Sequence, residues 1–550
     1  MGLKRVLLTV GIALLVSVGL VFAQVNWIKY TYFNNVGGLN DDLSVTEIAD
    51  NEATDLQNVV FDTGGAIKKR YGYITIPSGT ANTVSSGTGF CITGLHLYRQ
   101  SDGDRYLIAV GNEGGKALIY QKTYEVGGGV NMTSVWANIT SSGTVPATGY
   151  SNNYLASFAT AEDSAIITFK TTTGTKPLKY TGSGLVVPAI TDTDCPDASI
   201  VVYHKNHLFI NDIDNLSRIW FSALDDITDY TATDFIDIAT NDGTQVRGMV
   251  SAFDNLYIFK DRSIWRLAGY ERDSWVLSKM VEGIGSLSHQ SIAVVNNTIF
   301  FITDQNDVAA YDGGYNVKFL SQKIRNTIGG MNYARATNAL GLPYSSYRLG
   351  DRDYYAALSY AGSSENNRVI LFDTARNAWT KFIGFEPNAW CVGDDSVGKQ
   401  IMVLGDYDGY AHYYPSTTYQ DGNVTNSTIN AYYKTKWFKY PEVSLGDKYL
   451  RKLKTYTLSQ TTNSSYLNTE VYADYESQGK TISLPISQAG SVWDTAVWDE
   501  SLWSGQSLII NTTEIEKGKN MFQMKFSNNQ TSTGFTLFGW ETFIEPSERI

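Results

Sequence analysis

The feature that most constrains this fold is a β-hairpin that recurs seven times through the middle of the chain. Each copy has a short apolar strand, a turn rich in Asp, Asn and Gly, and a second strand that usually reaches an aromatic residue. Start-to-start spacings run from 42 to 59 residues, and the copies begin at Tyr106, Ala165, His207, Asn255, Thr298, Tyr354 and Gln400. Because a period of about 40–50 residues with several strands per unit is typical of β-propellers, we expect a closed propeller of six or seven blades.

The composition agrees with an all-β fold. The chain of 550 residues has 36 Tyr, 23 Phe and 12 Trp, beside 8 Met and 11 Pro. Aromatic residues and Thr favour strands, and Gly favours tight turns. The segment Gln322–Ile328 is the best candidate for a short helix.

Shifts in composition divide the chain into five segments. We expect a signal-like apolar segment over residues 1–23, an extended N-terminal arm over 24–84, and the propeller over 85–415. A linker rich in Ser, Thr, Asn and Gly follows over 416–428. The longer strands of residues 429–550 predict an antiparallel β-sandwich.

Three tryptophans in this last segment, Trp493, Trp498 and Trp503, stand at intervals of five. That spacing fits neither a helix face nor a strand face. The rings either pack on their own sandwich or anchor in a partner surface, where Trp is enriched.

The first segment has the pattern of a secretory signal. Lys4 and Arg5 precede an uncharged apolar run to Ala23, and small residues stand before Gln24. The run is also just long enough for a marginal membrane span.

Signatures of catalysis are missing from the sequence, which contains no GxSxG, HExxH, P-loop or Rossmann fingerprint. His204 and His207 form an HxxH pair, but residues i and i+3 of one strand point to opposite faces, so we expect no metal site there. We interpret Cys91, Cys195 and Cys391 as buried thiols.

Paired acids are the remaining candidates for chemistry. They are Asp225-Asp226, Asp351/Asp353 and Asp406/Asp408. Propeller glycosidases use such pairs, but the repeated Asp box of sialidases is missing and Asp is an ordinary turn residue. We therefore predict no enzyme, no cofactor, and no catalytic, cofactor-binding or metal-binding residue.

The charge of the chain limits how it could bind nucleic acid. The net charge of −12 argues against a protein that grips phosphates, although not against one that DNA slides past. A basic triplet, Lys68-Lys69-Arg70, follows an expected hairpin turn at Gly64-Gly65. It is either a solvated strand end or, less often for such triplets, a phosphate contact.

Two stretches of the chain resemble the tail hub, or nozzle, proteins of short-tailed, P22-like bacteriophages. The first lies within residues 34–73 and reads GGLN, NEATDLQNV and FDTGGAIKKRYGY. The second spans Gly243–Ile328 and includes QVRGM, LYIF, SIW, GIGS, FFI and LSQKI. The likeness extends loosely over nearly the whole chain, and the C-terminal segment stands where those proteins carry theirs.

This resemblance implies a structural subunit of a ring, expected to be a hexamer, in the tail of a virion. The ring would connect the portal and its head–tail adaptor to the tail needle or tail fibres, and DNA would pass through it without tight binding. The signal-like start departs from that family, since phage tails assemble in the cytoplasm. Three explanations are open: translation starts after this segment, the segment inserts into a membrane during infection, or the chain is instead a secreted or membrane-associated propeller that binds or, with less support, hydrolyses glycans.

Overall fold

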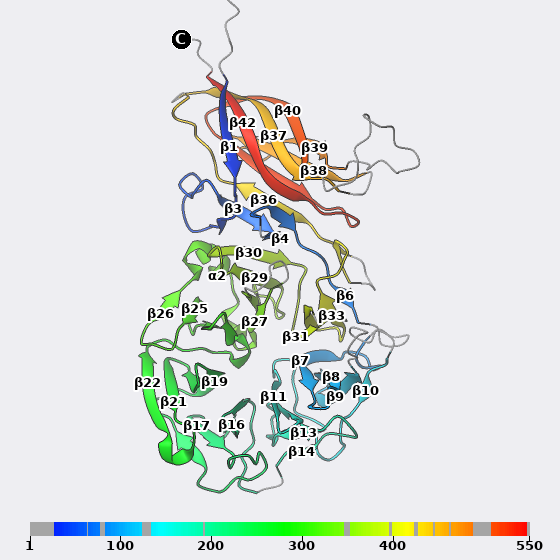
Figure 1. Cartoon of the computed structure of the whole chain (residues 1–550), viewed down its shortest axis with the longest axis vertical. Helices are drawn as coiled ribbons and strands as arrows, with labels where there is room; N and C mark the ends of the chain where they lie inside the picture. Colours follow the sequence, from blue (N-terminus) through cyan, green and yellow to red (C-terminus); the bar gives the residue numbers. More distant parts are fainter. Residues whose placement is uncertain are drawn as a thin grey trace, which may run out of the picture.

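The computed structural model describes residues 27–546, except 63, 77–82, 124–133, 191–192, 346–351, 395–398, 423–426, 444–445, 461–463 and 488–507. The signal-like segment 1–23, the three spaced tryptophans and Asp351 lie outside the described residues. In the part that is described, a disc of blades carries an elongated domain on its rim (Figure 1).

The disc is a propeller. It contains seven four-stranded antiparallel sheets in the described ranges, so the predicted fold class is confirmed and the ring has seven blades. The first strands of successive blades contact one another and form the inner wall, and between blades 4 and 5 the η2 turn (His289–Ser291) contacts β19. Blades 1 to 4 consist of β7 (Cys91–Arg99), β8 (Arg105–Glu113), β9 (Lys116–Thr123) and β10 (Ala137–Asn138); β11 (Ser157–Ala161), β12 (Ser164–Thr168), β13 (Leu178–Tyr180) and β14 (Val187–Pro188); β15 (Val201–His204), β16 (His207–Asn211), β17 (Arg218–Phe221) and β18 (Phe235–Asp237); and β19 (Val246–Ala252), β20 (Asn255–Lys260), β21 (Ser263–Ala268) and β22 (Val276–Glu282).

The remaining blades follow the same order, with one exception in the seventh. Blades 5 to 7 consist of β23 (Ala293–Val295), β24 (Thr298–Ile302), β25 (Val308–Tyr311) and β26 (Val317–Phe319); β27 (Leu340–Tyr344), β28 (Asp353–Leu358), β29 (Arg368–Asp373) and β30 (Ala378–Ile383); and β31 (Ala389–Asp394), β32 (Gln400–Gly405), β33 (Ala411–Tyr414) and β6 (Ile74–Thr75). All seven predicted hairpins are the second and third strands of a blade.

The exception closes the ring. The outer strand of blade 7 is β6, which comes from the N-terminal part of the chain and pairs with β33, Thr75 opposite His412. Residues more than 300 positions apart in the sequence therefore complete one blade. Such closure removes a free sheet edge from the propeller.

The elongated domain is a sandwich of two six-stranded sheets. One sheet has the order β4-β5-β42-β37-β40 with β1 also paired to β42, and the other has the order β2-β3-β36-β41-β38-β39. Their bounds are β1 (Ile28–Phe33), β2 (Gly38–Leu39), β3 (Glu52–Gln57), β4 (Val59–Phe61), β5 (Ile67–Lys69), β36 (Ala431–Thr435), β37 (Lys448–Leu458), β38 (Tyr466–Ala473), β39 (Lys480–Pro485), β40 (Leu508–Lys519), β41 (Phe522–Asn528) and β42 (Thr536–Pro546).

The segment expected to be an extended arm is thus divided between the two domains. Its strands β1 to β5 belong to the sandwich, and β6 belongs to the propeller. The sandwich core forms around aromatic rings, among them Tyr32 stacked on Trp540 at 5.6 Å between ring centroids. The linker region contributes a small hairpin of β34 (Gln420–Asp421) and β35 (Ser427–Thr428).

Helical structure is sparse. The predicted short helix is present as a 3₁₀ turn that runs into one α-helical turn between blades 5 and 6. None of the helices in the described ranges is long and apolar enough to cross a bilayer. The helical elements are η1 (Arg272–Ser274), η2 (His289–Ser291), η3 (Ser321–Ile324), α2 (Arg325–Gly329) and η4 (Tyr333–Asn338).

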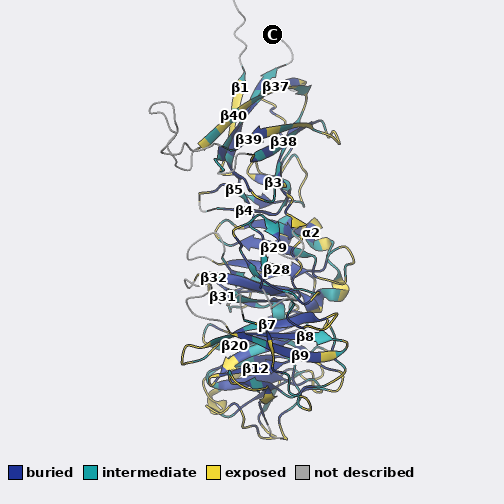
Figure 2. Cartoon of the chain, turned by 90° about the vertical axis from the view of Figure 1, so that its right-hand side faces the viewer, coloured by how far each residue is buried: buried dark blue, intermediate teal, exposed yellow. Residues whose placement is uncertain are grey.

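The two domains share one continuous hydrophobic core. A single cluster of buried side chains includes Trp540 and Leu453 of the sandwich and Phe300 and Trp379 of blades 5 and 6. In the side view, buried strands coloured dark blue lie on both sides of the junction, near β4 and β5 in the sandwich and near β28 and β29 in the propeller (Figure 2). The sandwich is therefore mounted on the propeller through a core rather than through a linker.

Candidate functional site

The axis of the propeller is occupied by its own side chains. The η2 turn, between blades 4 and 5, reaches across to blade 2, where His289 Nε2 lies 3.1 Å from Ser157 Oγ and Gln290 Nε2 donates to the Ala156 carbonyl at 2.6 Å. Burial lowers the pKa of His289 to about 4, so the ring is neutral at pH 7. In the described residues, side chains of η2 and blade 2 therefore meet across the axis.

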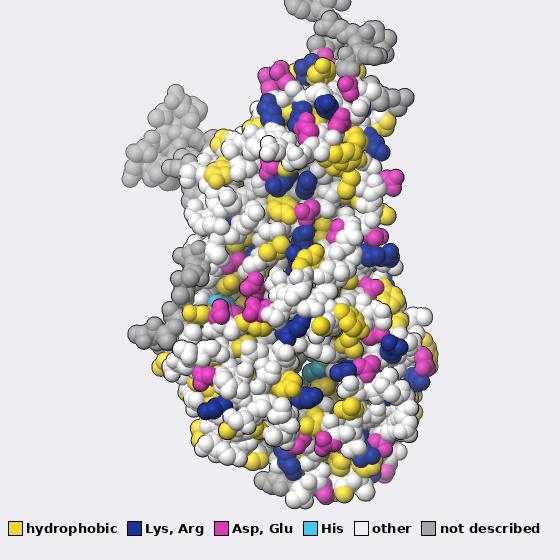
Figure 3. Space-filling model, turned by 180° about the vertical axis from the view of Figure 1, so that it is seen from behind, with side chains coloured by type: hydrophobic (Ala, Val, Ile, Leu, Met, Phe, Trp, Pro, Cys, Tyr) yellow, Lys and Arg dark blue, Asp and Glu magenta, His cyan; other side chains and the backbone are white. Residues whose placement is uncertain are grey.

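A hollow of about 350 Å³ lies beside this plug on the propeller face formed by the η2 and η4 turns. Figure 3 shows a depression near the middle of the propeller with a histidine at its floor and Lys and Arg side chains around it. Of its three cations, Arg247 pairs with Asp261 at 2.7 Å and Arg335 donates to Asn153. Its carboxylate, Asp212, is held by four donors within 3.1 Å.

A second cavity, of about 370 Å³, lies between blades 6 and 7 and gathers acidic and aromatic side chains. Figure 3 shows Asp and Glu side chains with a histidine among them on this face. The lining residues that carry chemistry are Glu365, Glu386, Asp406, Asp408, Asp421, His412, Tyr73, Tyr407 and Tyr410. We call this cavity the acidic pocket.

The acids of this pocket are not equivalent. Asp406 accepts from the backbone N–H groups of Asp408 and Tyr410 at 3.0 and 2.7 Å, and its other oxygen lies 3.0 Å from His412 Nε2. Burial, followed by the charges of Glu365, Asp406 and Asp408, raises the pKa of Glu386. A carboxyl with a raised pKa beside other acidic side chains is the pattern from which acid–base pairs are built, and aromatic rings beside carboxyl groups also suit a polyhydroxyl ligand.

Sequence reasoning found only part of this pocket. Asp406 and Asp408 were singled out as a turn pair, and Asp406 does act as a turn residue. Glu365 and Glu386 come from two other turns that carry no motif, and only the closure of blade 7 by β6 brings Tyr73 to the same place. The other acidic pairs stay apart from it: Asp226 caps its own turn, and Asp353 begins β28.

The basic triplet was expected to be a solvated strand end or a phosphate contact, and Lys69 and Arg70 fit neither description. Lys69 and Arg70 are buried, with 2% and 0% of their surface exposed, at the junction of the two domains. Arg70 Nη1 and Nη2 donate to the two oxygens of Asp421 at 2.8 and 2.6 Å, and its Nε donates to Asn58. Arg70 is thus a buried anchor between the N-terminal segment and the linker hairpin, whereas Lys68 is partly exposed and lies 3.2 Å from Asp62.

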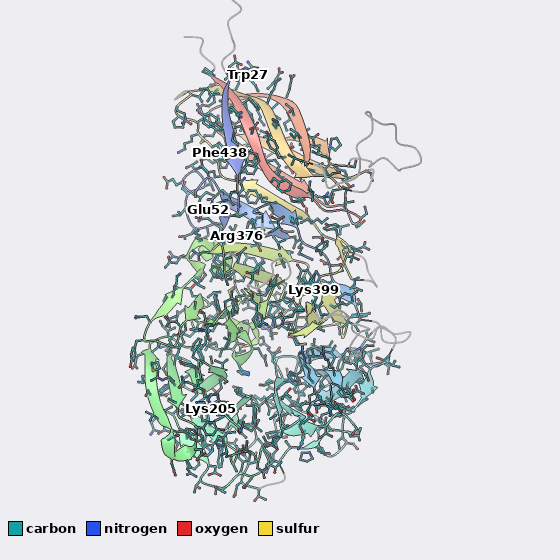
Figure 4. The ribbon with its side chains drawn as sticks, in the orientation of Figure 1. Trp27, Glu52, Lys205, Arg376, Lys399 and Phe438 are labelled. Atoms are coloured by element: carbon teal, nitrogen blue, oxygen red, sulfur yellow. The ribbon has the colours of Figure 1, made fainter. Side chains whose placement is uncertain are left out.

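The junction around this anchor contains further ion pairs. Glu52 lies 2.9 Å from Lys323, Asp55 lies 2.6 Å from Lys381, and Arg376 donates to the Asp62 carbonyl. Figure 4 labels Glu52 and Arg376 where the two domains meet, with Trp27 at the far tip of the sandwich. These contacts fix the orientation of the sandwich on blades 5 and 6.

The HxxH pair is arranged differently from the single strand that was assumed. His204 ends β15 and His207 begins β16, with a two-residue turn between them, so the two residues are cross-strand partners. Their Nδ1 atoms lie 2.7 Å from Ser251 Oγ and the Ser222 carbonyl, respectively. Within the described ranges no group of three or more His, Cys, Asp or Glu side chains is placed to hold a metal ion.

Comparisons with known proteins give distant propellers. No protein-family model and no curated protein matches the sequence. Among solved structures, a virginiamycin B lyase from Staphylococcus aureus is 12% identical, with 58% of this chain and 94% of that chain covered at a TM-score of 0.37. YCF48 bound to D1 peptide is also 12% identical, with 62% and 98% covered at 0.37. An exo-β-1,3-galactanase from Phanerochaete chrysosporium is 7% identical, with 86% and 100% covered at 0.26. These similarities are too distant to bear on function, and the propeller assignment follows from the sheet order.

Proposed function

We propose that the protein is a non-enzymatic structural subunit of a bacteriophage tail hub, or nozzle, located in the virion. Six copies would form a ring that connects the portal and its adaptor to the tail needle or tail fibres. DNA would leave the head through the middle of this ring and make no tight contact with it.

The observation that carries the proposal is the place of the phage-like sequence pattern in the fold. Residues 34–73 build the mount between sandwich and propeller. Gly38 approaches the backbone of Trp379 so closely that a Cβ atom would lie 2.6 Å from its nitrogen. Glu52 lies 2.9 Å from Lys323, and Asn58 Oδ1 accepts from the backbone N–H of Ile383 at 3.0 Å, both across the junction. The first of the two stretches that resemble tail hubs thus joins the two domains, which supports a shared two-domain plan.

The route of DNA follows from the closed propeller axis. Because η2 crosses the axis, DNA in such an assembly would pass between subunits and not through a propeller. A chain with a net charge of −12 suits that path, since each phosphate neutralised by a cation adds affinity and salt dependence.

The test is cryo-microscopy of particles from cells that produce the protein, combined with mass analysis of the culture medium. The proposal predicts density for a ring of propeller-bearing subunits at the tail vertex. Protein that is free in the medium, trimmed at Gln24 and missing from particles would overturn it.

A second candidate is the glycan-binding propeller, and the acidic pocket favours it. The pocket places three tyrosines beside four turn carboxylates on an open face. A glycan array probed with the wild type and with Tyr410→Ala tests this function. Binding that depends on Tyr410 would support it, and an array without signal would leave only the structural role.

A further inference from the structure

Within the described residues, three strands of the first sandwich sheet have a partner on one side only, and β1 and β40 are the two long ones. Along the long part of this sheet the order is β1-β42-β37-β40, and each neighbouring pair is antiparallel. Strand β40 is the terminal strand at one side and β1 lies at the other. Because the directions alternate over four strands, β1 and β40 run in opposite directions.

The β40 edge is long. It spans 12 residues, pairs with β37 along its whole length, and exposes alternate side chains from Leu508 to Glu516. Lys480 Nζ donates to the Ile515 carbonyl at 2.8 Å and protects one end. The part from Leu508 to Glu514 contains neither Pro nor Gly and only one charged residue, although unpaired edges are usually protected by such residues.

The β1 edge is shorter and equally apolar. Ile28 and Phe33 are 41% and 46% exposed, against 51% and 49% for Leu508 and Ile510. Tyr32 faces the core, so Lys29, Thr31 and Phe33 lie on the outer face of the sheet. Among the described strands, β1 pairs with β42 alone.

We propose that β40 of one copy pairs antiparallel with β1 of the next copy, with Thr512 opposite Thr31. This inference rests on the ring of the proposed function and names the surface that builds it. The sheet would then continue from subunit to subunit. Head-to-tail contacts of this kind close into a ring when the rotation between copies allows it.

The register follows from the side chains. Each row of residues on the outer face already crosses all four strands: Phe33, Gly539, Tyr456 and Ile510 form one row. With Thr512 opposite Thr31, this row would continue as Ile510 beside Phe33 of the next copy. Beyond the Thr31–Thr512 row, the next row would place Glu514, whose side chain is 70% exposed and lies 3.5 Å from Lys452, beside Lys29.

Opposite charges and apolar pairs directly across two strands stabilise a sheet. A shift by one residue would instead turn the outward side chains of β1 toward the core side of β40. The two edges are therefore complementary in direction, face and charge, which favours a second copy of this chain over an unrelated strand.

Disulfide trapping tests the pairing. Subunits with Thr31→Cys and subunits with Thr512→Cys are mixed and oxidised, since Cβ atoms of directly opposed residues approach the distance of a disulfide. We expect a covalent dimer of two 60.8 kDa chains from the mixture and none from either variant alone. The double variant should give a ladder that ends at the closed ring. Thr31→Cys with Thr513→Cys is the matched control, because residue 513 lies on the other face, and its cross-linking should fall at least tenfold.

The outcomes separate this interface from the proposed function. A ring seen by light scattering or on particles, without the 31–512 cross-link, would overturn the strand pairing and leave the hub role standing. Equal cross-linking of the 513 control would overturn the register. A chain that stays monomeric at its highest soluble concentration, and that gives no cross-link in particles, would count against both.

Discussion

Replacing Asp421 with Asn removes one charge from the buried anchor at the domain junction. Arg70 has no exposed surface and Asp421 has 3%, and the pair is bidentate with N–O distances of 2.8 and 2.6 Å. The Asn58 side chain and the Tyr71 and Ile383 carbonyls accept the remaining guanidinium donors. Without the carboxylate, the fully buried Arg70 guanidinium would lose its counter-charge.

The expected loss is large. Breaking a buried ion pair by removing one partner costs about 3–5 kcal/mol, because the remaining charge is uncompensated. Asp237→Asn is the matched control: Arg218 and Asp237 are also bidentate, at 2.7 and 3.0 Å, but are 23% and 39% exposed. For an exposed pair the loss should be about 0.2–1 kcal/mol.

Urea unfolding followed by tryptophan fluorescence measures both variants. Arg70→Met combined with Asp421→Leu should recover much of the loss, since apolar replacements of a buried pair are often neutral. A free energy of unfolding for Asp421→Asn that matches Asp237→Asn would refute the argument that the anchor holds the junction together.

Three further predictions concern pH. The pKa of Glu386 is raised mainly by burial, so the folded state binds this proton more readily than the unfolded state does. Stability should therefore fall as pH rises above the ordinary value of 4.5. In Glu386→Gln the unfolding temperature, measured from pH 4.5 to 8, should depend less on pH. Burial lowers the pKa of Lys69 from 10.5 to about 7, so stability should rise between pH 7 and 10, and urea unfolding of Lys69→Met should lack this rise. The pKa of His289 is lowered from 6.5 to about 4, so stability should decrease from pH 6.5 to 4, and in His289→Gln calorimetry should show a smaller decrease. A variant whose pH dependence equals that of the wild type would contradict the corresponding assignment.

The propeller could be predicted because its signal is local. Each hairpin joins strands that are neighbours in sequence, and each contains its own turn, as in β20 and β21 between Asn255 and Ala268. Repetition at a regular spacing then indicates the architecture even when single copies are irregular. The same local reasoning predicted the sandwich strands near Lys448 and Thr536.

The N-terminal strands could not be placed in the same way. Strand β1 pairs with β42 at the other end of the chain, Ile28 opposite Ile544, and nothing in a six-residue strand specifies so distant a partner. Strand β40 was missed altogether because its residues are largely polar and both of its faces are partly exposed. The HxxH pair was wrongly assumed to lie on one strand, because the two-residue turn at Lys205-Asn206 was not recognised as a hairpin turn.

The acidic pocket shows the same limit for sites. Its residues come from the turns of blades 6 and 7 and from the strand that closes the ring, so its chemistry appears only after the fold is complete. Asp406 and Asp408 were visible as a pair because they share one turn. Glu386, whose pKa is raised, has no acidic neighbour in the sequence that would mark it as part of a site.

The shared core bears on the choice between the two proposed functions. A propeller that only binds a ligand at one face has no need for a second domain fixed to its rim, and a mobile linker would serve it equally well. Here Trp379 and Phe300 of the propeller belong to the same buried cluster as Trp540, and Arg70 joins the N-terminal segment to the linker hairpin inside that junction. A rigid mount has a consequence in a ring: once the sandwich edges set the angle between neighbouring copies, every propeller is held in a defined orientation around the axis. This is the property that a structural subunit requires, and it is the physical reason for preferring the hub to the secreted binding protein.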